Sequence, residues 1–183
     1  MSTALLVMDM QEDVFAMVGA QGPALLARAA EAIATARAAH AQVIYVCLHF
    51  RPGYPEISAH NATFSGLAKM GKFTGPLGAD IPAAIAPEDG DLVVAKHRVS
   101  AFSGNDLEMI LRAKGITKLV CMGIATSGIV LSTIRHAMDL DYQLVVVRDC
   151  CADRDDEVHR VLCDKVFARQ AKVVDAAELA TAL

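Results

Sequence analysis

Six short apolar runs are spaced along the chain, and none of them alternates strictly between apolar and polar residues. Each run is rich in Val, Ile and Leu and has the length of a β-strand. Runs of this kind are typical of parallel strands that are covered on both faces. They occupy residues 4–9, 43–48, 91–96, 118–123, 143–149 and 172–176. The pattern predicts a buried, mainly parallel sheet.

Segments rich in Ala and Leu lie between most of these runs and follow the period of a helix. They cover residues 22–40, 105–115, 127–140 and 155–170. Pro23 fits a first helical turn, and Gly115 fits the position that follows a helix end. Alternating strands and helices favour a three-layer α/β/α sandwich of Rossmann-like type, joined by right-handed crossovers. We expect a single domain over residues 1–183.

Residues 49–82 interrupt this alternation. The segment holds four of the six prolines and five of the twelve glycines. A connection of this length in a compact domain is typically a lid, a binding loop or a subunit contact. We expect one short helix within it, near residues 63–70. The alternative is a mobile surface excursion.

Composition narrows the classes of function. The chain is 54% hydrophobic and 21% charged, with a formal net charge of −4. This balance excludes disorder and lacks the basic surface that neutralises nucleic-acid phosphates. Asp9 ends the first apolar run too early for a signal peptide or membrane span, so we expect a cytoplasmic protein. The five cysteines form no C-x-x-C pair and are expected to be buried thiols rather than disulfides.

Candidate chemistry gathers where the strands end. Ligands of open parallel sheets bind beyond the carboxyl ends of the strands. The first strand ends in Asp9, the third ends in Lys96, and the fourth runs into a turn of small residues at 123–128. A carboxylate, an ammonium and free backbone N–H groups are suited to proton transfer and to stabilising an oxyanion. The alternative is that these charged residues only mark the ends of strands.

Three ordered motifs resemble a known superfamily over essentially the whole chain. They are LLVMDMQEDVF, then KHRVSAF with NDLEMILRAKG, and then GIATSGIVLSTIRHAMDLDYQLVVVRDCCAD. Together they resemble the isochorismatase-like (cysteine hydrolase) superfamily. The resemblance implies a six-stranded parallel sheet flanked by helices. It also implies hydrolysis of small amides, ureas or related substrates by an Asp, Lys, Cys triad.

Two of the three triad positions match the pattern. Asp9 matches the aspartate of the family, which is a general base, and Lys96 matches its lysine. Gln11 matches the usual Asp-x-Gln opening, and Thr126 matches the threonine of the Gly-x-x-Thr turn. The position of the nucleophilic cysteine holds Ile129. Family members that hydrolyse a vinyl ether also lack this cysteine and use the aspartate and water, although they carry a glycine there.

Other groups could complete the site. The resemblance implies a cis peptide between Ile124 and Ala125, which would aim the N–H groups of Ala125 and Ile129 at one point to bind an anion or oxyanion. Side chains that could replace the missing thiol are weak candidates: Cys121 is expected to be buried within its strand, and Ser127 and Ser132 lack a recognisable histidine partner.

Histidines after the second apolar run are the candidate metal ligands. Relatives of the nicotinamidase type bind zinc through an Asp and two His, but Leu48 stands near the position of that Asp, and His49 and His60 lack an acidic companion. We therefore expect no metal and no cofactor. Gln11, Phe15, Phe102 and Thr126 are predicted to line the substrate pocket, although the aromatic residues fit the core equally well.

These observations favour a hydrolase that acts on a small molecule through an Asp9/Lys96 acid-base pair and water. The alternatives are an inactive relative that binds a small carboxylate or amide, and an amidase with a different nucleophile. We expect neither a nucleic-acid nor a membrane partner. We expect a homo-oligomer, dimer or tetramer, with residues 49–82 at the subunit contact.

Overall fold

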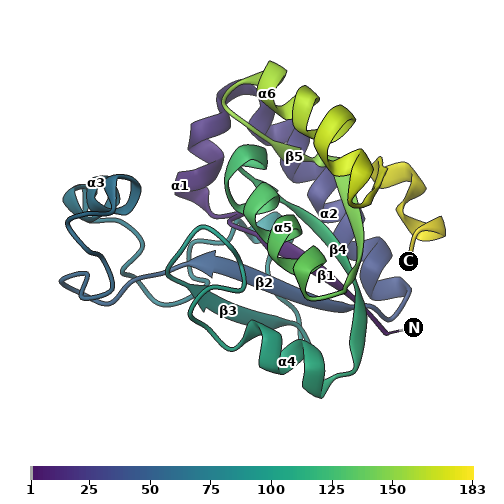
Figure 1. Cartoon of the computed structure of the whole chain (residues 1–183), viewed down its shortest axis with the longest axis horizontal. Coiled ribbons are helices and arrows are strands. Elements are labelled where there is room, and N and C mark those ends of the chain that lie inside the picture. The colour runs from purple at the N-terminus through teal and green to yellow at the C-terminus, as the bar shows by residue number, and fades with distance from the viewer. Residues whose placement is uncertain (1) are drawn as a thin grey trace.

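The computed structural model describes residues 2–183 and contains a six-stranded sheet in the order β3-β2-β1-β4-β5-β6 (Figure 1). Every neighbouring pair of strands is parallel, which confirms the predicted sheet. The strands are β1 (Ser2–Met8), β2 (Gln42–Leu48), β3 (Leu92–Lys96), β4 (Ile116–Ile124), β5 (Gln143–Ala152) and β6 (Lys172–Val174). All six lie within two or three residues of an apolar run identified in the sequence.

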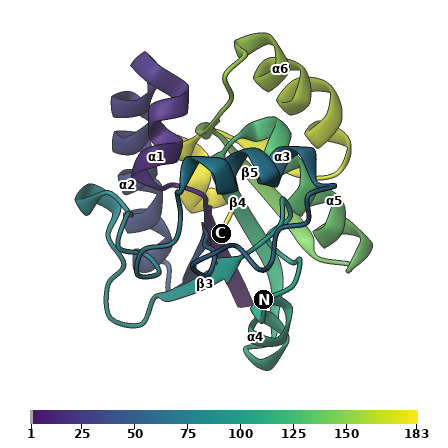
Figure 2. The ribbon, with the colours of Figure 1, turned by 90° about the vertical axis from the view of Figure 1, so that its left-hand side faces the viewer.

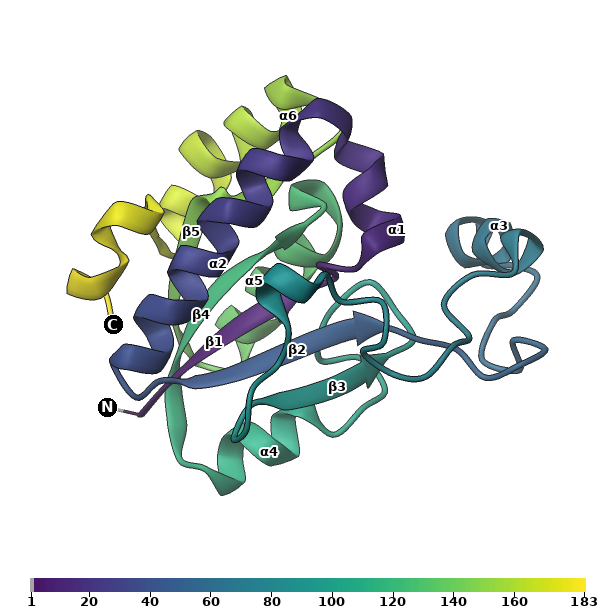
Figure 3. The same cartoon turned by 180° about the vertical axis from the view of Figure 1, so that it is seen from behind.

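Helices cover both faces of the sheet. Helix α2 (Gly22–Ala38) lies on one face, and α4 (Leu107–Ala113) and α5 (Leu131–Asp139) lie on the other (Figures 1 and 3). The buried positions of α2 recur every three or four residues, so that one side of the helix faces the strands. The three-layer α/β/α architecture predicted from the sequence is therefore confirmed. No helix within residues 2–183 has the length and apolar character that a bilayer crossing needs.

The remaining helical segments are shorter. They are α1 (Glu12–Phe15), η1 (Ala16–Gln21), α3 (Ala62–Met70), η2 (Ala83–Ile85), η3 (Thr126–Val130), α6 (Asp156–Val161), η4 (Leu162–Val166), η5 (Phe167–Arg169) and η6 (Ala176–Thr181). The segment predicted as one helix over 155–170 is α6 followed by η4 and η5. The helical turns α1, η1 and η6 have no counterpart in the sequence prediction.

Residues 49–82 leave the body of the molecule at the carboxyl end of the sheet and carry α3 outward (Figures 1 and 2). The short helix predicted near residues 63–70 is α3. Asn61 caps α3 by accepting a hydrogen bond from the Phe64 N–H, and Gly71 ends the helix in a left-handed conformation. Phe64 is buried against Phe50 and Leu48 in a small separate apolar cluster. The excursion is therefore anchored to the sheet by its own core.

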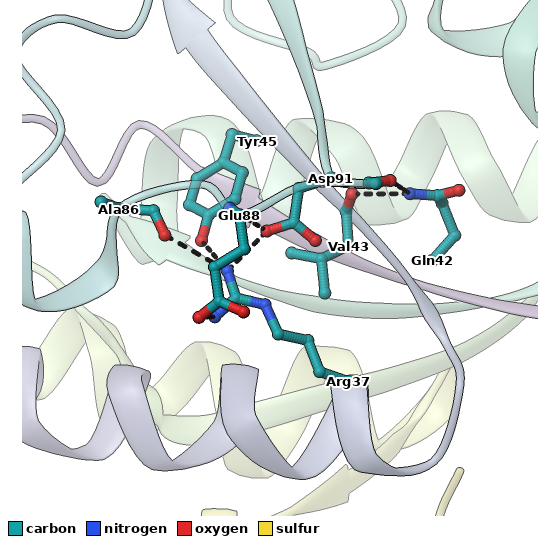
Figure 4. A network of polar contacts seen from close by, with 8 residues as sticks. Arg37, Gln42, Val43, Tyr45, Ala86, Glu88 and Asp91 are labelled. Atoms are coloured by element: carbon teal, nitrogen blue, oxygen red, sulfur yellow. Dashed lines mark hydrogen bonds and ion pairs between the residues drawn. The ribbon is translucent and has the colours of Figure 1, made fainter.

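The opposite end of the sheet is held by a polar network around Arg37, at the C-terminal end of α2 (Figure 4). Its guanidinium group pairs with Glu88 and Asp91 and also donates to the Ala86 carbonyl and the Tyr45 hydroxyl. Burial raises the pKa of Tyr45 to about 12. The network fastens the segment before β3 to α2, and the cavity of about 550 Å³ beside it lies far from the carboxyl ends of the strands.

Candidate active site

Asp9 and Lys96 meet across the end of β2. Asp9 follows β1 and Lys96 ends β3, and β2 lies between these two strands. The Lys96 ammonium lies 2.8 Å from Asp9 Oδ2 and also donates to the Arg98 carbonyl at 3.0 Å. Only 2% of Lys96 is exposed. The structure thus brings together the two charged residues that the sequence singled out.

The carboxylate of Asp9 is held in an unusual electrostatic environment. Its backbone has a φ of 52°, and its N–H donates to the Val46 carbonyl at 2.9 Å, which fixes the residue at the exit of β1. Burial raises the pKa of Asp9, Lys96 opposes that shift, and the nearby carboxylate of Asp80 adds to it. The net direction is upward, so Asp9 keeps its proton to a higher pH than an ordinary carboxyl group does.

One oxygen of Asp9 is left without a partner. Oδ2 faces Lys96, whereas Oδ1 is buried and accepts no hydrogen bond from residues 2–183. An unpaired buried acceptor costs about 1–3 kcal/mol, so its persistence points to a ligand or water as its natural partner. Oδ1 is therefore the oxygen of Asp9 whose hydrogen-bonding capacity is not used within residues 2–183.

Both the nitrogen and the oxygen of the Gln11 side-chain amide form hydrogen bonds within the protein. Its Nε2 donates to the Leu48 carbonyl at 3.1 Å and to Asp80 Oδ2 at 2.7 Å, while its Oε1 accepts from the Leu48 N–H at 2.8 Å. Gln11 thus ties the exit of β1 to the exit of β2 and to the end of the excursion. It also lines a cavity of about 370 Å³ that extends under residues 71–80.

The turn after β4 lies beside Asp9, because Met8 and Gly123 are paired in the sheet. A Cβ on Gly123 would stand 2.3 Å from the Met8 carbonyl oxygen, so only glycine allows the two strands to approach this closely. The peptide bond between Ile124 and Ala125 is cis, as predicted. Ile129, which follows in η3, is 2% exposed and presents only hydrocarbon.

Two side chains from the segment after β5 hold this turn. Asp153 Oδ2 accepts from the Ser127 N–H at 2.7 Å, and His159 Nδ1 lies 2.8 Å from Thr126 Oγ1. The Gly128 and Val130 N–H groups donate to the Ala125 carbonyl. Neither the Ala125 nor the Ile129 N–H is among these donors, so the pair of amides predicted to bind an anion is not used by these contacts.

Asp153 and His159 contact the turn, although neither is among the site residues predicted from the sequence. Asp153 follows β5 directly, so the rule that nominated Asp9 and Lys96 applies to it equally and could have found it. His159 lies on α6, and no spacing in the sequence places its ring beside Thr126. Only the packing of α6 against η3 does so.

The predicted pocket aromatics occupy different places. Phe15 is half-buried between the main core and a small cluster that includes Ile124. Phe102 is buried against the rings of His136 and Tyr142, with centroids 5.1 and 6.0 Å away. Phe73, which the sequence did not suggest, joins the Ile124 cluster to the apolar cluster of the excursion.

The cysteines are all free and buried. Burial raises the pKa of Cys121, and also that of Cys47, to about 12, which keeps these thiols protonated and unreactive. Ser127 is exposed and Ser132 is half-buried, and within residues 2–183 no histidine side chain forms a hydrogen bond with either hydroxyl. Within the same residues, His, Cys, Asp and Glu side chains form no group of three that could hold a metal ion.

Comparison with known proteins places these features in a family. Residues 3–178 match the model of the isochorismatase domain. The chain is 32% identical over 184 residues to the uncharacterized isochorismatase family protein YecD of Escherichia coli O157:H7, covering 100% of this chain and 96% of the relative. It is 36% identical over 171 residues to the ureidoacrylate amidohydrolase RutB of Variovorax paradoxus (strain S110), covering 80% of this chain and 67% of the relative.

A solved structure agrees with the sequence relatives. The crystal structure of an isochorismatase family protein from Desulfovibrio vulgaris subsp. vulgaris str. Hildenborough superposes with a TM-score of 0.85 at 28% identity, covering 99% of this chain and 97% of that one. The domain match spans nearly the whole sequence, and the YecD alignment spans all of it. The chain belongs to the isochorismatase family.

Proposed function

We propose that the protein is a hydrolase that acts on a small molecule through Asp9, Lys96 and water, without a cysteine nucleophile. The observation that carries this proposal is the buried ion pair of 2.8 Å in which the second oxygen of Asp9 has no partner among residues 2–183. A buried charged pair is costly to maintain, and here it leaves one acceptor free at the ligand-binding edge of the sheet. Relatives named as amidohydrolases support hydrolysis as the reaction class.

The proton balance of the proposed reaction needs only water. Asp9 in its acid form donates a proton from Oδ1 to the substrate, and a water molecule adds to the centre that becomes electron-poor. The added water then returns a proton to Asp9 as the bond to the leaving group breaks. The upward shift of the Asp9 pKa makes the acid form easier to reach, and Lys96 stabilises the carboxylate that forms when the proton is donated.

Ile129 decides which substrates this chemistry suits. We assign Ile129 to the position at which the family's thiol would stand. Since an alkyl side chain cannot form an acyl intermediate, amide hydrolysis loses its covalent route. A substrate that needs proton transfer, such as an enol ether or another activated bond, is favoured. The N–H groups of Ala125 and Ile129 would bind an oxygen of this substrate.

A second candidate function has one observation in its favour. The same apolar Ile129, 2% exposed, would also suit an inactive relative that binds a small carboxylate or amide. The third candidate function is an amidase with another nucleophile. Thr126 is the candidate nucleophile, because its hydroxyl lies 2.8 Å from His159 Nδ1.

Turnover of a substrate panel separates these functions. The panel contains small amides, ureides and enol ethers, tested on the purified protein, on Asp9→Asn and on Thr126→Val. We expect hydrolysis of an activated substrate that Asp9→Asn abolishes and Thr126→Val only reduces. Thermal stabilisation by a panel compound without any turnover would instead identify a binding protein. Turnover that survives in Asp9→Asn and is lost in Thr126→Val would identify a different nucleophile.

We further propose that the protein consists of a single domain, works in the cytoplasm and forms a homo-oligomer through the excursion at residues 49–82. Met70 and Leu77 are exposed apolar residues of this segment and could contribute to such a contact. Sedimentation at micromolar concentration should show a dimer or tetramer. A clean monomer there would contradict the oligomer.

A further inference from the structure

The turn that carries the cis peptide is held from outside by one short stretch of chain. Asp153, at the end of β5, binds the Ser127 N–H, and His159, on α6, contacts the Thr126 hydroxyl. Both Thr126 and Asp153 are buried, and Thr126 has no exposed surface. Thr126 and Ser127 directly follow Ala125, so these two contacts set the direction in which the chain leaves the cis bond.

The surroundings of His159 define which of its nitrogens carries the proton. Nδ1 faces Thr126 Oγ1 at 2.8 Å, and Nε2 faces the Cys163 sulfur at 3.8 Å. A buried threonine hydroxyl needs an acceptor, and Nδ1 is the acceptor that the structure offers it within residues 2–183. This arrangement places the proton of the neutral imidazole on Nε2, toward the sulfur.

We propose that His159 is a positioning residue for the turn over residues 125–129: its neutral imidazole accepts the Thr126 hydroxyl, and together with Asp153 it holds the Ala125 and Ile129 N–H groups in place for substrate. The role of these N–H groups toward substrate rests on the proposed function. The hydrogen bond and its effect on the turn do not depend on any activity.

Protonation of His159 would work against this arrangement. An imidazolium has no free lone pair at Nδ1, so the Thr126 hydroxyl would lose its acceptor. Burial lowers the pKa of His159, as does Arg148 on β5, whereas the carboxylates of Asp153, Asp156 and Asp164 partly offset the shift. The neutral form therefore prevails at pH 7, and the turn would loosen only as the solution becomes acidic.

The first experiment reads the hydrogen bond directly and needs no substrate. Side-chain ¹⁵N NMR of the full-length protein should show His159 Nδ1 unprotonated and Nε2 protonated at pH 7. Backbone amide signals of residues 125–129 should move with the titration of His159. In Thr126→Val, which replaces the hydroxyl by a methyl group of similar size, these amide signals should no longer follow that titration, whereas Thr126→Ser should restore the response.

Two results of this experiment would overturn the proposal. One is a proton on Nδ1 at pH 7, which would make His159 a donor. The other is an amide response at residues 125–129 that is unchanged in Thr126→Val. Melting temperatures confirm that each variant folds, and Thr126→Ser and His159→Gln provide the readout if Thr126→Val does not fold. His60→Gln is the matched control, since His60 is exposed on the excursion.

The second experiment uses the substrate found by the panel. His159→Gln and Thr126→Val should lower kcat on the order of tenfold, as expected for loss of one buried hydrogen bond that orients a reacting group, while KM changes less. The acidic limb of the pH profile should lose the component that follows His159. Unchanged kcat and pH profile in both variants would refute the positioning role and leave the proposed function intact. Absence of turnover in the wild type would refute the proposed function but leave the NMR result standing.

Discussion

The two carboxylate oxygens of Asp9 lie in different surroundings, and this difference gives them different roles. Oδ2 lies 2.8 Å from the ammonium of Lys96, whereas Oδ1 is buried without a partner in the described chain. A symmetric carboxylate would share its charge between two equal sites. Here the ammonium holds one oxygen, and the other oxygen keeps its hydrogen-bonding capacity unused within residues 2–183.

Lys96→Met should destabilise the fold and raise the pKa of Asp9 still further, because the ammonium is the main group that opposes the effect of burial. Loss of one member of a buried pair costs about 3 kcal/mol. Urea unfolding at neutral pH measures this loss. Lys72→Met removes the exposed pair with Asp13 and should cost less than about 1 kcal/mol.

The double variant Asp9→Asn with Lys96→Met checks the cause of that loss. Because it leaves no uncompensated carboxylate, it should be more stable than Lys96→Met alone. A double variant that loses the sum of the two single effects would show that the residues do not interact.

Ile129→Cys tests whether the rest of the site can support covalent chemistry. The thiol would stand in the helical turn that follows the cis peptide. We expect amide hydrolysis to appear in this variant, measured as ammonia release from small amides. Ile129→Ser serves as the control, since it has a similar small polar group but is a weaker nucleophile. Equal activity in wild type and Ile129→Cys would contradict the assignment of this position.

The sequence predicted which charged residues lie together, but not which side-chain contacts hold the turn after β4. Asp9 and Lys96 were identifiable because polar residues at the ends of apolar strands must share one edge of a parallel sheet. The contact between Thr126 and His159 could not be identified from the sequence, because the direction of a side chain on α6 depends on how that helix packs against η3.

Among the elements, β1 and β4 approach each other closely at Gly123. A Cβ at this position would stand 2.3 Å from the Met8 carbonyl oxygen, so Gly123→Ala must push the two strands apart next to Asp9. We expect a loss of about 3 kcal/mol, at the upper end for an overpacked core. Gly66 lies within α3 and has open space around it, so Gly66→Ala should be neutral or stabilising by up to about 1 kcal/mol. Thermal unfolding of both variants provides the comparison.

The stability that His159 contributes where α6 packs against η3 should depend on pH. The pKa of His159 is lowered in the folded state from its ordinary value of 6.5, so the unfolded chain binds the proton more readily. Stability from this residue is fully present above about pH 6.5 and falls as the pH decreases toward the folded-state pKa.

His159→Gln should remove this component. The difference in unfolding free energy between wild type and His159→Gln should therefore shrink between pH 7.5 and pH 5.5. His60→Gln should track the wild type throughout. A constant difference over this pH range would mean that His159 titrates alike in both states.

Element prediction succeeded where an apolar pattern was long and failed where it was short. Strands β1, β2, β4 and β5 and helix α2 carry many buried residues that the sequence displays directly, whereas β3 and β6 bury fewer positions. Helical turns α1 and η1 bury only Val14 and Val18, which is too few positions to show a period. Their placement follows from the contact of the Glu12 N–H with the Asp80 carbonyl, a contact between residues far apart in the sequence.

For the whole molecule, the sheet order could be expected only through the family resemblance. Alternating strands and helices indicate a parallel sheet, but the reversal of strand order between β1 and β4 depends on which way each crossover runs. That reversal places the turn after β4 next to Asp9. The alternation of apolar runs and helical segments thus predicts the three layers, whereas tertiary packing decides the order of the strands.

Both ends of the excursion are fastened to the sheet, which bears on how the chain tolerates being cut. His97 Nδ1 contacts the His49 carbonyl at 2.6 Å, and Gln11 holds Asp80 at 2.7 Å. A protease nick near α3 would separate β1 and β2 from β3 to β6, yet β3 and β4 flank that pair on either side. The two fragments would therefore stay paired strand to strand. Separately expressed fragments divided near residue 60 should reassemble into one sheet.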